Sequence, residues 1–220
     1  MSIIETVRAA SFMRVAVPFT LTLAMVGGTA AGQTPTAPPG QDGWSLEVST
    51  NTYIVPDSEN YLQPTIAADH DWLHVEARFN YEDRDTGSLW LGYNFRFGEE
   101  VALEFTPMIG AVIGNSAGIA PGYKASLRWR MVDLYSETEY VVDAGESTDS
   151  FLYTWSEFAL APTDWARFGL VVQRTKVYRS PFAIQRGFFA GFSYQRVEMA
   201  AYVFNPDASP TVVIAISIGF

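Results

Sequence analysis

The sequence is poor in the residues that build metal and disulfide sites. Its 220 residues include no cysteine and only two histidines, His70 and His74. The absence of cysteine excludes a disulfide framework and a cysteine-ligated metal site. The two histidines lie four residues apart in an extended segment, which does not reproduce the helical spacing of a zinc site. We therefore predict no metal and no cofactor.

Lysine is also scarce, since Lys124 and Lys176 are the only two in the chain and the other basic residues are arginines. Arginine is favoured where charges pair away from bulk water, because its planar guanidinium makes bidentate contacts with carboxylates. This bias favours a crowded polar interior. After residues 1–32, 12 basic and 23 acidic residues remain, a net charge of 12 − 23 = −11. Such a charge argues against nucleic acid as a partner.

The chain has no apolar run of the roughly 20 residues that a membrane-spanning helix needs. Its longest such run, residues 15–28, follows Arg8 and Arg14 and ends in the small residues of 28–32. This pattern predicts a cleaved secretory signal peptide over residues 1–32. The proline-rich residues 33–42 predict a periplasmic linker. Residues 43–220 remain for a single domain.

Apolar and polar residues alternate along this domain with the two-residue period of β-strands. In residues 72–82 the odd positions from Leu73 are apolar, and the even positions from His74 are polar. Pro64 and Pro107 interrupt the pattern and predict a bulge or a shortened strand. We predict an all-β fold, an antiparallel up-and-down barrel of twelve strands, or of ten if the first two segments do not count separately. The predicted strands cover residues 44–54, 61–68, 72–82, 89–97, 101–113, 123–131, 134–142, 151–160, 165–175, 184–194, 197–204 and 211–220.

The last ten residues, T-V-V-I-A-I-S-I-G-F, place branched apolar side chains on one side and small ones on the other. An uncharged strand of this kind invites aggregation unless both of its edges are paired, which a closed barrel achieves. The segment, ending in Phe220, resembles the terminal signature of Gram-negative outer-membrane β-barrels, which their assembly machinery reads. The resemblance implies a transmembrane, porin-like barrel in the outer membrane, with outer-membrane lipid and the assembly machinery as partners. It specifies no activity.

Alternation alone also fits a soluble barrel such as a lipocalin, in which the two faces are exchanged. A soluble barrel would bury Phe79 and Leu91 and expose Glu76 and Arg78, whereas a membrane barrel does the reverse. The scarcity of lysine, the signal peptide and the uncharged last strand favour the membrane barrel. Aromatic residues near strand ends predict two girdles. These are Phe97, Trp129, Tyr194 and Phe220 on the periplasmic side and Tyr81, Tyr123 and Tyr140 on the external side.

The polar face of the strands supplies the candidate site, the lumen. Within one hairpin we predict that Arg128 and Arg130 face Glu137 and Glu139. The residues predicted to line the lumen are His74, Glu76, Arg78, Asn94, Arg96, Glu104, Lys124, Arg128, Arg130, Glu137, Glu139, Glu157, Arg167 and Glu198.

Such a lumen predicts a narrow passive channel for small polar or charged solutes. The alternative is a closed structural barrel, plugged by salt bridges among the same residues. An enzyme of the barrel wall, a lipid hydrolase or acyltransferase, is a third interpretation. It is disfavoured because only His70 and His74 could act as a base, and His70 lies in a predicted turn while His74 is predicted to point inward. We therefore predict no catalytic residue.

A second cluster of charge lies outside the predicted lumen. Arg174, Lys176, Arg179 and Arg186 follow one another around a single connection without an intervening acid. At the external rim they are candidates for contact with lipopolysaccharide phosphates or anionic solutes. The alternative is solvated loop charge, which contributes little.

Overall fold

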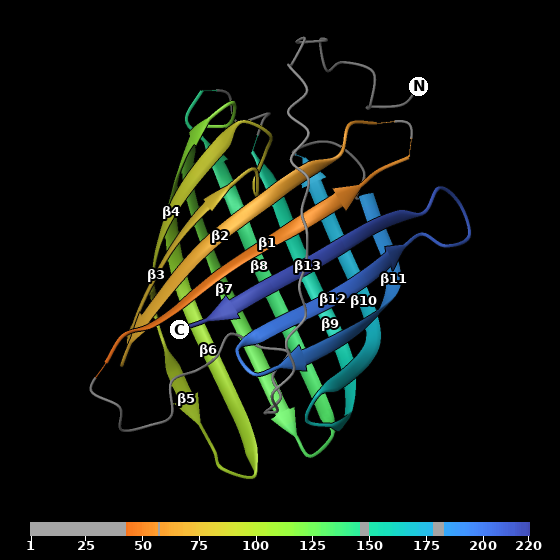
Figure 1. Cartoon of the computed structure of the whole chain (residues 1–220). Coiled ribbons are helices and arrows are strands. Elements are labelled where there is room, and N and C mark those ends of the chain that lie inside the picture. The colour runs from red at the N-terminus through yellow and green to blue at the C-terminus, as the bar shows by residue number, and fades with distance from the viewer. Residues whose placement is uncertain (1–42, 57, 146–149, 178–182) are drawn as a thin grey trace.

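The computed structural model of the chain describes residues 43–56, 58–145, 150–177 and 183–220, which form a barrel of antiparallel strands (Figure 1). The predicted signal peptide, residues 1–32, and the predicted linker, residues 33–42, lie outside these described residues. Within the described residues, no helix is long and apolar enough to cross a membrane.

Thirteen strand segments build the barrel, and two of them, β4 and β5, belong to one strand that is interrupted at Asn94. Both pair with β6 in a continuous register. The barrel therefore has twelve strands, and the ten-strand alternative is wrong. The segments are β1 (Ser45–Ile54), β2 (Tyr61–His70), β3 (Leu73–Phe79), β4 (Thr86–Tyr93), β5 (Phe95–Phe97), β6 (Val101–Gly114), β7 (Gly118–Trp129), β8 (Val132–Asp143), β9 (Phe151–Thr163), β10 (Ala166–Val177), β11 (Ala183–Tyr194), β12 (Val197–Phe204) and β13 (Thr211–Gly219).

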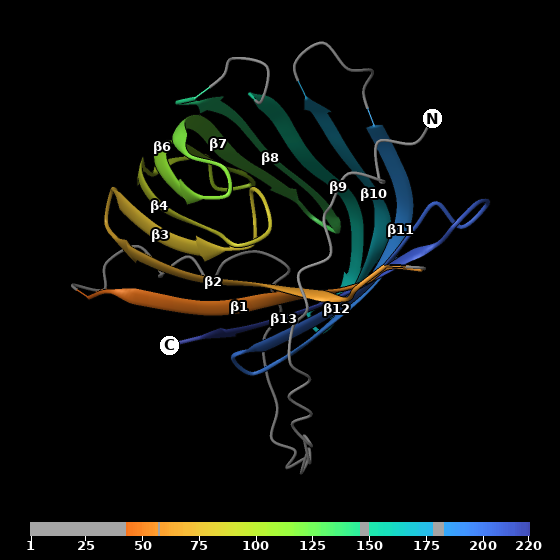
Figure 2. The same ribbon diagram turned by 90° about the horizontal axis from the view of Figure 1, so that it is seen from above.

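The first and last strands close the barrel. β13 pairs antiparallel with β1 over eight residue pairs, from Glu47–Gly219 to Ile54–Val212. Every other strand pairs with its neighbours along the chain, so the sheet has no open edge among the described strands. Seen along the barrel, the strands form a ring in which β1, β2, β12 and β13 make one flattened wall (Figure 2). The predicted antiparallel up-and-down barrel is confirmed.

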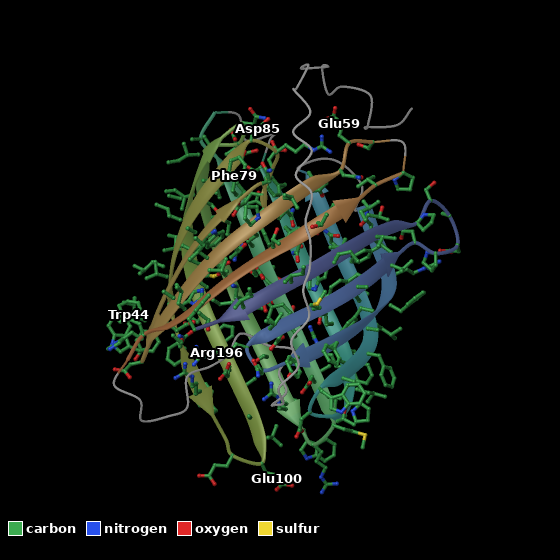
Figure 3. The ribbon with its side chains drawn as sticks, viewed as in Figure 1. Trp44, Glu59, Phe79, Asp85, Glu100 and Arg196 are labelled. Atoms are coloured by element: carbon green, nitrogen blue, oxygen red, sulfur yellow. The ribbon has the colours of Figure 1, made fainter. Side chains whose placement is uncertain are left out.

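The two ends of the barrel differ in their connections. At the turn end, two or three residues join successive strands, as at 71–72 and 130–131. At the loop end, the connections after β1, β3, β8 and β12 span six or seven residues. Glu59 and Asp85 lie at the loop end and Glu100 lies at the turn end (Figure 3). We use these two names for the ends below.

The outer face of the barrel is apolar, whereas the buried charged side chains lie on the inner face. Ile113 is 72% exposed, and Phe79 and Leu91 are exposed as well. Glu76 and Arg78 are buried inside. A soluble barrel with the opposite arrangement is therefore excluded, because only a lipid environment favours an apolar exterior of this extent.

Neither proline forms a bulge. The ladder between β2 and β3 begins at Thr65, next to Pro64. The break between β4 and β5 lies opposite Pro107, since strand pairing stops at Gly92–Met108 and resumes at Phe95–Phe105. A proline has no N–H to donate, so the ladder is interrupted there without a change of register.

Candidate functional site

Arg78 of β3 is the centre of a buried charge cluster inside the barrel. Its Nε donates to Glu76 Oε1 at 2.7 Å, and its Nη1 donates to Glu139 Oε2 at 2.9 Å. Its Nη2 lies 2.7 Å from Glu137 Oε1, and Lys124 of β7 donates to Glu76 Oε2. The Arg78 side chain is 0% exposed. We call these five residues the Arg78 cluster. The cluster joins β3 to β7 and β8, and β3 pairs with neither of these two strands in the sheet.

A chain of hydrogen bonds runs from the Arg78 cluster toward the turn end. His74 Nε2 lies 3.0 Å from Glu76 Oε2, and His74 Nδ1 lies 2.8 Å from Asp69 Oδ1. A neutral imidazole has one N–H, so only the imidazolium donates to both carboxylates. Asn94 Nδ2 donates to Asp69 Oδ1 at 2.7 Å, and Thr106 Oγ1 donates to Asn94 Oδ1 at 2.6 Å. These hydrogen bonds hold Asn94, which lies at the break between β4 and β5, to Asp69 of β2 and Thr106 of β6.

Two aromatic rings pack against the Arg78 guanidinium. Its Cζ lies 4.3 Å from the ring centroid of Tyr81 and 4.7 Å from that of Trp90. Cation–π contacts of this kind contribute about 0.5–2 kcal/mol each. The indole of Trp90 occupies the space left by Gly110, where an added Cβ would meet it at 2.6 Å. Trp90 Nε1 also donates to Ser88 Oγ at 2.9 Å, so the ring is held in place.

A second polar cluster lies on β9, β10 and β12. Glu157 Oε1 accepts hydrogen bonds from Trp155 Nε1 at 2.8 Å and from the Tyr202 hydroxyl at 2.9 Å. Glu157 Oε2 accepts one from Arg167 Nη1 at 2.9 Å. The Arg167 guanidinium lies 5.0 Å from the ring centroid of Phe189. We call Trp155, Glu157, Arg167 and Tyr202 the Glu157 cluster.

A cavity of about 190 Å³ separates the two clusters, and residues of both line it. The remaining lining comes largely from β1, β2 and β13, with small or uncharged polar side chains such as Ser49, Asn51, Thr65 and Ser217. A second cavity of about 50 Å³ lies among Asp69, Asn94, Arg96 and Glu104. Lys124 and Tyr135 line both cavities, so the two meet at these side chains.

The interior toward the loop end is filled by apolar and aromatic side chains. Tyr202 stacks on Phe189 with ring centroids 5.1 Å apart, and Trp155 meets both Tyr202 and Phe204 edge to face. These packed rings narrow the interior, and two of them, Trp155 and Tyr202, also line the larger cavity. Buried members of this core include Tyr53, Met108, Val112, Val141, Phe151, Tyr153, Val171 and Val213.

Comparison with known proteins gives relatives in structure only. No family model matches the sequence, and no curated protein matches it. A solved structure of the KdgM porin matches with a TM-score of 0.55 at 9% identity, over 79% of this chain and 99% of that one. The fold resembles that of the KdgM porin. A KdgM porin in complex with disordered oligogalacturonate matches with a TM-score of 0.52 at 8% identity, over 80% of this chain and 99% of that one. At such identities the likeness shows the shared barrel fold.

The predicted pairing of Arg128 and Arg130 with Glu137 and Glu139 is wrong. Arg128 lies opposite Asp133, with Nε 3.4 Å from Asp133 Oδ1. Arg130 is not on a strand but in the turn, with φ of 52° and a side chain that is 71% exposed. Arg130 therefore does not line the lumen.

The other predicted lumen residues lie on the inner face of the barrel. Arg96 Nε lies 3.6 Å from Glu104 Oε1, and both line the smaller cavity. Glu198 lines the larger cavity together with Arg167 and Glu157. The structure thus gathers residues from strands far apart in sequence into two clusters and two cavities. Their role in transport stays a prediction.

Among the contributors to the interior that sequence reasoning missed are Asp69 and Tyr81. We assigned Asp69 to a turn, but β2 continues to His70 and Asp69 holds His74. We placed Tyr81 in the external aromatic girdle, and that is wrong. β3 ends at Phe79, and Asn80, with φ of 58°, turns Tyr81 inward to Arg78. Asparagine tolerates positive φ better than most residues, so Asn80 was the one sign in this segment that β3 could end before Tyr81.

The predicted external cationic cluster is only partly described. Arg179 lies outside the described residues, as does the side chain of Lys176. Arg186 donates from Nη2 to Asp207 Oδ2 at 2.8 Å, an acid that the sequence pattern did not pair with it. This hydrogen bond lowers the pKa of the Asp207 carboxyl below its usual value. Arg174 is exposed, and its contact with lipid phosphates stays a prediction.

The site presents hydrogen-bonding and charged side chains toward the interior of the barrel. His74 contacts Asp69 and Glu76, two carboxylates that hold it in place. In the part of the chain that the structure describes, no group of three or more His, Cys, Asp or Glu residues could hold a metal ion. The arrangement can therefore exchange hydrogen bonds with a polar solute.

Proposed function

We propose that this protein is an integral outer-membrane barrel that forms a narrow passive channel for small polar or charged solutes. The observation that carries this proposal is a polar interior with two cavities that meet at Lys124 and Tyr135, inside a closed barrel with an apolar exterior. The packed rings toward the loop end and the two charge clusters restrict the free cross-section. Only small solutes are therefore expected to pass.

A closed structural barrel is the second candidate, and a specific observation favours it. Arg78 is bound to three carboxylates and two rings, so one side of the interior is filled by groups that neutralise each other. Such a plug stabilises the barrel without a transport role.

Single-channel recording in planar bilayers distinguishes the two candidates. The protein is purified, refolded in detergent and shown by heat-modifiable gel mobility to form a barrel. Stable conductance steps support the channel. A folded barrel that gives no steps in repeated insertions contradicts the channel and supports the closed barrel.

Lys124→Ala should raise the single-channel conductance, by about twofold. Lys124 lines both cavities, so its removal widens the point where they meet. Glu76 keeps its contacts with Arg78 and His74, so the Arg78 cluster should persist. Arg186→Ala, which removes an exposed side chain outside the lumen, is the control. An unchanged or lower conductance in a folded Lys124→Ala barrel would show that Lys124 does not limit the path.

We also propose that Phe220 is read by the outer-membrane assembly machinery. Its ring is exposed, whereas its backbone N–H donates to Leu46 O at 2.8 Å. Phe220→Ala should therefore lower the yield of barrel assembled in producing cells several-fold, while unaided refolding in detergent is unaffected. Leu103→Ala, on the outer face of β6, is the matched control. Equal assembly of Phe220→Ala and wild type in cells contradicts the role.

A further inference from the structure

The two cavities are lined by more acidic than cationic side chains, and two of the acidic side chains form no ion pair in the described part of the chain. We propose that the channel prefers cationic and neutral solutes over anionic ones, and that Glu47 and Glu198 set this preference. The inference rests on the proposed channel function and names its solute class.

Carboxylates outnumber cationic groups in the lining. With all seven carboxyl groups ionised, the three cationic and seven acidic side chains give the lining a net charge of 3 − 7 = −4 when His74 is neutral and of −3 when it is protonated. A narrow lumen with walls of low dielectric concentrates this field on a passing solute. The acidic side chains are Glu47, Asp69, Glu76, Glu104, Glu137, Glu157 and Glu198, and the cationic ones are Arg96, Lys124 and Arg167.

Each cationic group of the lining already contacts a carboxylate. Arg96 contacts Glu104, Lys124 contacts Glu76, and Arg167 contacts Glu157. Outside the lining, Arg78 neutralises Glu137 in the same way. Each cationic group of the lining therefore has a carboxylate beside it before any solute enters.

Glu47 and Glu198 differ from the other acids. In the described part of the chain, neither forms an ion pair within 4.0 Å. Glu47 lies opposite Gly219 and Glu198 lies opposite Ser217, so the two flank β13 where its side chains are small. Strands that share one neighbour are about 10 Å apart. Two carboxylates thus line one wall of the larger cavity with no bulky side chain between them.

A third acceptor lies in the same cavity. Gln63 is 8% exposed and donates from Nε2 to Asn80 O at 3.0 Å. Its Oε1 accepts no hydrogen bond from the described residues. This buried acceptor is unsatisfied, and a buried polar group without a partner is costly.

The expected solutes are consequently small cations and neutral molecules rich in hydrogen-bond donors. An acidic polymer such as oligogalacturonate, which one KdgM porin structure contains, carries the same sign of charge as this lining. We expect it to be excluded from this barrel, so the shared fold does not extend to a shared solute.

Reversal potentials in a KCl gradient test the inference. Wild type should pass K⁺ in preference to Cl⁻, and E47Q/E198Q should lower the permeability ratio by roughly threefold at 0.1 M salt. The control is E59Q/E100Q, which removes two exposed carboxylates at the ends of the barrel and should leave the ratio unchanged. Glutamine keeps the side-chain volume, so the conductance itself should change little.

The outcomes separate this inference from the function on which it rests. Conductance steps without a preference for K⁺ overturn the inference but still support the channel. The same holds if E47Q/E198Q leaves the permeability ratio of K⁺ to Cl⁻ unchanged. A folded barrel without steps overturns both. A ratio that falls equally in E59Q/E100Q assigns the preference to the rims and overturns the roles of Glu47 and Glu198.

Discussion

Arg78→Met is expected to destabilise the barrel by about 3–5 kcal/mol, because it leaves buried carboxylates without their counter-charge. Arg78 contacts Glu76, Glu137 and Glu139, and its side chain is 0% exposed. Methionine has a similar volume and no charge, so the loss comes mainly from the missing charge and its hydrogen bonds rather than from a cavity. The free energy of unfolding is measured by urea titration of the detergent-refolded protein, followed by tryptophan fluorescence.

Two variants show whether the loss belongs to the uncompensated carboxylates. Arg78→Met combined with Glu137→Gln and Glu139→Gln removes two of the stranded charges and should recover part of the stability. Arg130→Met, which removes an exposed arginine from a turn, should change stability by less than about 0.5 kcal/mol. Arg78→Met with wild-type stability would mean that the Arg78 cluster does not hold the barrel together.

The strands could be predicted from the sequence because alternation is local. Each strand needs only its own residues to show which face is apolar, and the uncharged last strand requires a partner on each edge. The prediction therefore gave the strand number, the closure and the inward face of residues such as Glu76 and Arg78 correctly.

Register could not be predicted with the same success, because it depends on where a turn lies. We expected the turn after β7 at residues 132–133, but it lies at 130–131. A turn that moves by two residues moves every cross-strand partner by four, so Arg128 pairs with Asp133 instead of Glu137. Little in the sequence indicates a turn at Arg130, because this residue adopts a positive φ that arginine rarely takes.

Contacts across the lumen were beyond sequence reasoning for a different reason. Arg78 and Glu139 are 61 residues apart and lie on strands that do not pair. Their contact depends on barrel diameter and on which side chains are small enough to let others reach inward. Parity predicts that both point inward, but it does not say which carboxylate Arg78 meets.

Gly110→Ala is expected to destabilise the barrel by about 1–3 kcal/mol, the usual cost of overpacking a well-packed site. The added Cβ would lie 2.6 Å from the indole of Trp90, which real Cβ atoms do not tolerate. Trp90 cannot move freely, because Ser88 accepts its N–H and Arg78 packs against its ring. The clash should therefore displace the Arg78 guanidinium from its carboxylates. Urea titration measures the loss.

Gly87→Ala is the matched control, since its Cβ would meet Arg78 O at an ordinary 3.7 Å. Gly87→Ala should lower the free energy of unfolding only slightly, or even raise it, because alanine reduces the backbone entropy of the unfolded chain. In a Trp90→Leu background the Gly110→Ala cost should largely disappear, because the clashing ring is gone. A full cost in that background would assign the effect to the backbone at Gly110. The space at Gly110 would then be unrelated to how the Arg78 cluster is held.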